Sequence, residues 1–217
     1  RLLIFAVLGV LCLSCARQEE PDVEVSKETA PEAALDVKSV KMPAIKSTGR
    51  EILIADFNSG EKPNNIGGDF GAWDRDPEDP TQYAIDSFIS AIKLGEEGFS
   101  LQIYYDVDSP NPAYNGFWMS LNNIDASKNS ALSFWVKGDP LRGYTSTFKV
   151  ELKNSKGEVG KYYVSQISDN WQEIIIPFKY LRGLNDYSSL EELTFVFEDM
   201  TATRKEGAIY IDDVYIK

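Results

Sequence analysis

The sequence predicts an all-β sandwich domain over residues 49–217, preceded by a signal peptide and a flexible tether. Every aromatic residue except Phe5 lies beyond residue 50, so the composition changes near Gly49. After that point come about nine short segments rich in β-branched and aromatic residues, separated by Gly, Pro, Asn, Asp or Ser. No convincing amphipathic helix stands among them, and closely spaced strands without helices are typical of a sandwich or barrel.

Residues 1–15 are predicted to be a lipoprotein signal peptide. The stretch "RLLIFAVLGVLCLSCA" has one basic residue, then an apolar run too short for a membrane-spanning helix, then small residues. Its end, "LCLSC", resembles the lipobox of bacterial lipoproteins, in which a cysteine after a small residue is lipidated. Cys15 after Ser14 fits that role, although Cys12 stands where the lipobox usually has Leu. The alternative is a plain signal peptide cleaved after Ala16.

Residues 16–48 are predicted to be a flexible tether. They are mainly Glu, Pro, Ala, Val and Lys without an aromatic residue, so they cannot bury enough apolar surface to offset the entropy lost on ordering. A coil of this length reaches on the order of 30 Å. Together with a lipid on Cys15, the tether predicts a domain anchored to a membrane of the bacterial cell envelope, on its periplasmic or surface side.

The predicted strands are, in chain order, "EILIADF", "FSLQIYYD", "GFWMSL", "ALSFWVKG", "TFKVELK", "KYYVS", "WQEIIIPF", "LTFVFED" and "AIYIDDVYI". In "TFKVELK" apolar residues alternate with charged ones, so one face belongs to the core and the other is open. The apolar residues are Phe148, Val150 and Leu152, and the charged residues are Lys149, Glu151 and Lys153. Trp135 falls on the outer face of its strand, where it needs cover from a loop, a partner or a ligand. The last strand changes parity around Asp212 and Asp213, which predicts a bulge there or burial on both faces.

Charge and composition exclude several classes of function. A net charge of −12 and a pI near 4.5 argue against nucleic acid, which requires clustered Lys and Arg. The chain has no histidine, and Cys12 and Cys15 are its two cysteines, so histidine-dependent catalysis and thiol chemistry in the domain are excluded. A glycosidase would need a pair of carboxylates about 5 to 10 Å apart, and the sequence singles out none. We therefore expect a protein that is not an enzyme.

The order of the strand phrases resembles the family 11 carbohydrate-binding modules and the related complex I intermediate-associated protein domains. The phrases are "ILIADF", "NGFWMSL", "ALSFWVKG", "ISDNWQEIIIPF" and "GAIYIDDVYI", and they span residues 51–217. The resemblance implies a jelly-roll β-sandwich of the galactose-binding type. It also implies a carbohydrate ligand on a concave sheet face and a neighbouring loop.

The resemblance implies particular ligand-binding residues. They are Arg182, Asp186 and Tyr187 in the loop after the "IIIPF" strand, Phe117 and Trp118 in an early strand, and Phe197 and Glu198, where Phe197 replaces a family tyrosine. Aromatic faces cover the C–H patches of sugars, while carboxylates and guanidinium groups bind hydroxyls. The alternative is that Trp118 and Tyr187 pack in the core or a loop, and that Arg182 and Asp186 form a solvated ion pair.

A structural calcium ion is a further prediction. Galactose-binding-type jelly rolls often carry one where the first and last strands meet, and Asp56 and Asp212 match that place by resemblance. The alternative is that these carboxylates cap turn amides. Alternate acidic residues at Asp74, Asp76 and Glu78 also hint at a calcium loop, but they fit a long ordered loop more simply.

The sequence thus supports a non-catalytic carbohydrate-binding domain on an envelope lipoprotein. A structural or protein-interaction module that meets another envelope protein through its exposed aromatic residues is the alternative.

Overall fold

The structure is a computed structural model that describes residues 49–217, so the predicted signal peptide, tether and lipidated Cys15 lie outside the described residues. The strands are β1 (Ile52–Ala55), β2 (Phe70–Asp74), β3 (Tyr83–Ile89), β4 (Ser100–Asp106), β5 (Tyr114–Ile124), β6 (Ala131–Gly138), β7 (Phe148–Asn154), β8 (Val159–Val164), β9 (Gln172–Pro177), β10 (Leu190–Glu198) and β11 (Glu206–Ile216). A short 3-10 helix, η1 (Phe178–Tyr180), follows β9. Among these residues no helix is long and apolar enough to cross a membrane.

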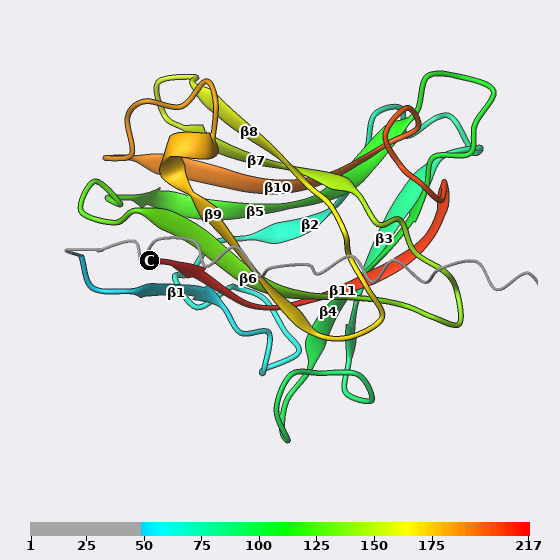
Figure 1. The fold of residues 1–217 in the computed structure, drawn as a ribbon, viewed down its shortest axis with the longest axis horizontal. Coiled ribbons are helices and arrows are strands. Elements are labelled where there is room, and N and C mark those ends of the chain that lie inside the picture. Colours follow the sequence, from blue (N-terminus) through cyan, green and yellow to red (C-terminus); the bar gives the residue numbers. More distant parts are fainter. Residues whose placement is uncertain (1–48) are drawn as a thin grey trace, which may run out of the picture. The chain divides into compact units, whose positions relative to one another are not determined.

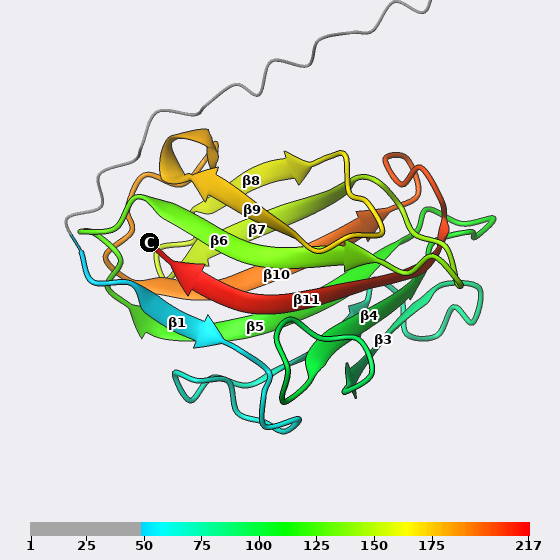
Figure 2. The same cartoon turned by 60° about the horizontal axis from the view of Figure 1, so that its bottom comes forward.

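The strands form two antiparallel sheets that pack face to face as a jelly-roll sandwich (Figure 1). One sheet has the order β3-β4-β11-β6-β9, with β1 paired to β11, and the other has the order β2-β5-β10-β7-β8. Figure 2 shows β6, β11 and β1 in one layer, with β10 and β5 in the layer behind. The predicted all-β fold class is therefore confirmed.

The core lies between the sheets and is built from the inward residues of the alternating strands. Phe148, Val150 and Leu152 are fully buried, as the alternation in β7 predicted. Phe134 from one sheet meets Phe195 from the other edge to face, with ring centroids 5.1 Å apart. Each large apolar side chain contributes roughly 1.5–3 kcal/mol through burial, so this layer holds the two sheets together.

The last strand contains the predicted irregularity. The pairing of β11 with β6 shifts register between Asp212 and Tyr215, and Asp213 has a φ of 46°. Strict alternation from the inward Ile211 would turn the Val214 side chain outward. Because the bulge adds one residue between them, Val214 points into the core as well. The segment before β3, which contains Asp74, Asp76 and Glu78, was expected to be a long loop. Its first part is instead strand β2 (Phe70–Asp74), which pairs with β5.

Candidate functional site

The outer face of the sheet β2-β5-β10-β7-β8 carries the candidate site. Its inward residues, such as Phe117, Phe148 and Phe195, are buried in the core, so their neighbours in sequence point outward. Strand pairing aligns the outward residues in three rows across the sheet. The rows are Trp73–Gly116–Val196–Lys149–Tyr163, then Gly71–Trp118–Thr194–Glu151–Lys161, then Ser120–Glu192–Lys153–Val159.

A cleft of about 460 Å³ lies over these rows. It is lined by Trp73, Tyr114, Trp118, Lys149, Glu151, Lys153, Glu192, Thr194 and Val196. Three aromatic residues come from β2 and β5, and the charged residues come from β7 and β10. The cleft therefore has an aromatic side and a charged side.

On the aromatic side, Trp73 and Tyr114 pack edge to face with ring centroids 5.8 Å apart. The Arg75 guanidinium lies 5.2 Å from the centre of the Tyr114 ring and supports it from one face. At Gly116, between these rings and β10, a Cβ atom would lie 1.9 Å from the Phe195 carbonyl oxygen. A glycine is thus required for β5 and β10 to approach so closely under the cleft.

On the charged side, Lys149 lies between two carboxylates, Glu151 at 3.0 Å and Glu198. Burial lowers the pKa of Lys149, but the contacts with Glu198 and Glu151 outweigh burial and raise it above its ordinary value. The Tyr163 hydroxyl donates to Glu198 Oε2 at 3.1 Å. These contacts hold the side chains of this cleft wall in fixed places.

A second ion pair extends the charged side toward the next row. Lys153 Nζ donates to Glu192 Oε1, and the Thr194 hydroxyl donates to the same oxygen at 3.0 Å. Because Thr194 lies opposite Glu151 in the sheet, the two ion pairs are neighbours.

Of the residues predicted to bind ligand, Trp118 lines the cleft and Glu198 belongs to its charged side. Phe117 and Phe197 are fully buried, so the expectation that they contact a ligand is wrong. The ring of Phe197 stacks on Tyr105 in the core, with centroids 4.0 Å apart. Side chains alternate between the two faces of a strand. Phe117 precedes the outward Trp118 and Phe197 precedes the outward Glu198, so both phenylalanines point inward.

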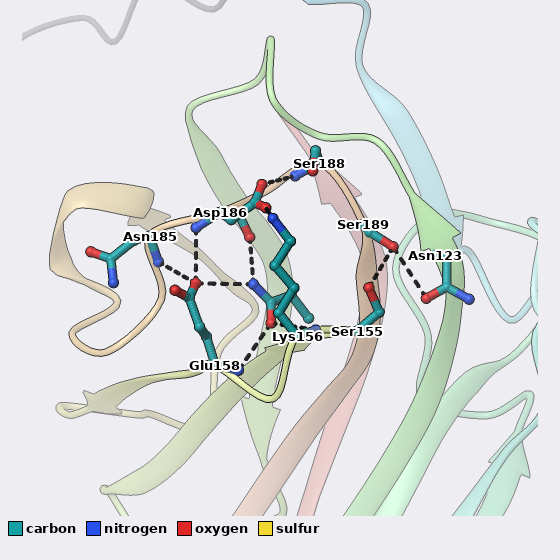
Figure 3. A network of polar contacts seen from close by, with 9 residues as sticks. Asn123, Ser155, Lys156, Glu158, Asn185, Asp186, Ser188 and Ser189 are labelled. Carbon is teal, nitrogen blue, oxygen red and sulfur yellow. Dashed lines mark hydrogen bonds and ion pairs between the residues drawn. The ribbon is translucent and has the colours of Figure 1, made fainter.

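Asp186 has a structural role in the loop after η1 (Figure 3). Its carboxylate accepts a hydrogen bond from the Ser188 backbone N–H at 2.9 Å and pairs with Lys156 in the β7–β8 turn. The contact with Lys156 holds the pKa of Asp186 well below its usual range. Glu158 Oε2 accepts from the backbone N–H groups of Asn185 and Asp186, which ties the loop to the same turn.

Tyr187 and Arg182 also lie outside the cleft. The Tyr187 ring stacks on Phe178 with centroids 4.1 Å apart, and its hydroxyl donates to the Phe178 carbonyl at 2.8 Å. Burial raises the pKa of Tyr187 to about 12. Arg182 is exposed beside β8, where its carbonyl accepts from the Lys161 N–H. A separate hollow of about 320 Å³ borders Arg182 and Tyr187, so the three predicted loop residues do not join Trp118 in one site.

The two predicted calcium ligands have protein partners. Asp212 accepts from the backbone N–H groups of Leu94 at 3.0 Å and Asp213 at 2.9 Å, and burial raises its pKa to about 6. Asp56 accepts from the Asn58 N–H and the Asn65 side-chain amide. Within residues 49–217 no group of three or more His, Cys, Asp or Glu could hold a metal ion. The carboxylates fit the capping interpretation, and calcium stays a prediction.

The chain is thus a two-sheet sandwich with an aromatic and charged cleft on the outer face of one sheet. Residues 39–200 match the model of a carbohydrate binding domain (family 11), and the chain therefore belongs to that family. No curated protein matches the chain.

Solved structures agree on the fold. The family 11 carbohydrate-binding module of the cellulosomal cellulase Lic26A-Cel5E of Clostridium thermocellum is 20% identical, with a TM-score of 0.55 over 77% of this chain and 94% of that chain. A Clostridium thermocellum family 11 module in complex with a β-1,3-1,4-mixed-linked tetrasaccharide is 19% identical, with a TM-score of 0.56 over 76% of this chain and 94% of that chain. An exo-β-agarase is 13% identical, with a TM-score of 0.54 over 76% of this chain and 24% of that chain.

Most residues of the charged side were not among the predicted ligand-binding residues. The alternation in "TFKVELK" placed Lys149, Glu151 and Lys153 on the open face, which is the signal that could have identified them. Pairing of that strand with β10 could not be deduced from the sequence, so Glu192 and Thr194 were not connected to them.

Proposed function

We propose that the cleft on the outer face of β2-β5-β10-β7-β8 binds a poly- or oligosaccharide without catalysis. The observation that carries the proposal is the placement of Trp118 on one side of the cleft and the Lys149 ion pairs on the other, in a chain of a carbohydrate-binding family. An indole face covers the C–H surface of a pyranose, and carboxylates and ammonium groups bind its hydroxyls.

Catalysis is disfavoured by the state of the cleft carboxylates. In a glycosidase one carboxyl group must carry a proton to act as general acid. Glu151, Glu192 and Glu198 are each ion-paired with a lysine of the cleft, so none of these three carboxyl groups stands unpaired beside it. The proposed activity is therefore binding alone.

We further propose that the domain is displayed in a bacterial cell envelope by a lipid on Cys15, with residues 16–48 as its tether. The support is the lipobox-like end of residues 1–15. Labelling of cells with a palmitate analogue tests the anchor: the wild-type chain should incorporate label and the Cys15→Ala variant should not. Equal labelling of both would reject it.

A protein partner in the envelope is the second candidate function. It is favoured by the outer face of the other sheet, where Ile175 is 42% exposed, opposite Ser133 and in line with Tyr215. An exposed isoleucine in line with a tyrosine fits a protein contact, because aromatic residues are enriched in such interfaces.

Tryptophan fluorescence distinguishes the two candidates. The domain is titrated with soluble mixed-linked glucan, mannan and xylan, and binding in the cleft should shift the emission. Trp118→Ala should abolish the shift with a glycan, whereas Trp135→Ala, on the outer face of the other sheet, should keep it. No response of the folded wild-type protein to any glycan would reject the first candidate.

A further inference from the structure

Two glutamates, Glu151 and Glu192, line the cleft, and a third, Glu198, pairs with Lys149 of its lining. Their carboxylates differ in how many oxygens the protein itself engages. Glu198 uses both: Oε1 contacts Lys149, and Oε2 accepts from the hydroxyls of Tyr163 and Thr201. A carboxylate satisfied on both oxygens is a poor acceptor for an added ligand. Glu198 therefore holds Lys149 in place.

Glu151 and Glu192 differ from Glu198. Within residues 49–217, the hydrogen bonds and ion pairs of both carboxylates involve Oε1: that of Glu151 contacts Lys149 and Lys161, and that of Glu192 contacts Lys153 and Thr194. Both side chains line the cleft. Their Oε2 atoms are therefore the acceptors that remain for a ligand in it.

The spacing of these acceptors suits one sugar ring. Trp118 lies opposite Thr194, and Thr194 lies opposite Glu151, so two strand spacings, or about 10 Å, separate Trp118 from Glu151. Glu192 is two residues before Thr194, and its diagonal separation from Glu151 is about 7–8 Å between Cα atoms. A pyranose placed against the Trp118 ring therefore has both carboxylates within reach of its hydroxyls.

We propose that Glu151 and Glu192 are the specificity-determining residues of the cleft, that Lys149 positions Glu151 and Lys153 positions Glu192, and that the two glutamates select neutral sugars over acidic ones. This inference rests on the proposed function. Ionised carboxylates accept hydrogen bonds from hydroxyl groups, which every neutral sugar supplies. A uronate would bring a third carboxylate to the pair, and the lysines that could offset it are already paired.

The test is calorimetric titration of the full domain with neutral oligosaccharides, namely the β-1,3-1,4-mixed-linked tetrasaccharide and cello-, manno- and xylo-oligosaccharides, and with oligogalacturonate of equal length. The neutral probe bound most tightly serves for the variants. Glu151→Gln and Glu192→Gln should each lower affinity about tenfold or more, as expected for a lost bond to a charged acceptor. Glu191→Gln, next to Glu192 but exposed outside the cleft lining, is the matched control and should bind as wild type.

Two further readouts complete the test. Wild type should bind the neutral probe more tightly than oligogalacturonate. In Glu151→Gln and Glu192→Gln the ratio of these two affinities should be smaller than in wild type. Melting curves check that each variant is folded, and Glu192, whose side chain is 29% exposed against 14% for Glu151, provides the variant with the smaller risk to stability.

The possible failures are distinguishable. Suppose that wild type and Glu191→Gln bind a neutral probe, that Trp118→Ala does not, and that Glu151→Gln and Glu192→Gln keep wild-type affinity. The proposed function then stands, and this inference is overturned. Tighter binding of oligogalacturonate by wild type overturns it as well. If folded wild type binds no probe, both proposals fall.

Discussion

Replacing Lys149 by methionine tests whether the charged side of the cleft is a partly buried ion-pair network. Lys149 is 9% exposed, and the side chains of Glu151 and Glu198 are 14% and 21% exposed. Methionine keeps most of the aliphatic stem, so the change removes charge with little loss of packing. Two carboxylates then remain close together without their shared cation. Breaking such a pair costs about 3 kcal/mol, at the lower end of the buried range because the glutamates keep some contact with water.

A loss of this size should lower the melting temperature by roughly 6 to 12 °C in a domain of this length. Urea unfolding followed by tryptophan fluorescence gives the free energy of unfolding directly. Lys156→Met is the matched control: it removes the Lys156–Asp186 pair, in which the lysine side chain is 66% exposed, and should change stability little. Equal effects of the two substitutions would refute the view that Lys149 sits in a protected network.

Three other predictions concern the residues outside the cleft. Tyr187→Ala should destabilise the domain by about 3 kcal/mol because it removes the ring stacked on Phe178. Tyr187→Phe should destabilise it by about 1 kcal/mol because only the hydroxyl is lost. Neither variant should change glycan affinity, and a loss of affinity in a variant of normal stability would contradict this. Arg182→Ala should bind glycans as wild type in the same titration, since Arg182 does not line the cleft. Burial raises the pKa of Asp212 to about 6, so the folded state retains a proton that the unfolded state releases near pH 4. The free energy of unfolding should therefore fall by about 1–2 kcal/mol as pH rises from about 4 to 6. Asp212→Asn should flatten this part of the pH profile of stability. A bound calcium ion would reverse that trend, and chelation would then lower the melting temperature.

Much of the fold followed from the sequence because alternation is a local signal. The pattern in β7 fixed which residues enter the core, and the change of parity at Asp212 located the bulge in β11. Strand β2 was missed, since "GGDFGAWDRDPEDPTQ" contains too many Gly, Pro and Asp residues to read as a strand. It forms because β5 offers an unpaired edge, which is information from the tertiary structure.

The site was harder to predict because it depends on which strands become neighbours. Glu151 and Glu192 lie in separate segments, and only the pairing of β7 with β10 brings them together. The loop residues drew attention because Arg, Asp and Tyr stand close in sequence. In the structure Asp186 is engaged by Lys156 and Tyr187 by Phe178, so chemical character alone did not reveal a ligand surface.

The most direct test of the account is a titration of the isotope-labelled domain with the β-1,3-1,4-mixed-linked tetrasaccharide, or another neutral oligosaccharide that binds, followed by 1H–15N NMR spectra. We predict that the largest shifts fall on the Trp118 indole N–H and on backbone amides of β5, β10 and β7 that border the cleft. Shifts concentrated in residues 178–187, with the Trp118 signal unchanged, would contradict the assignment of the cleft as the sugar site.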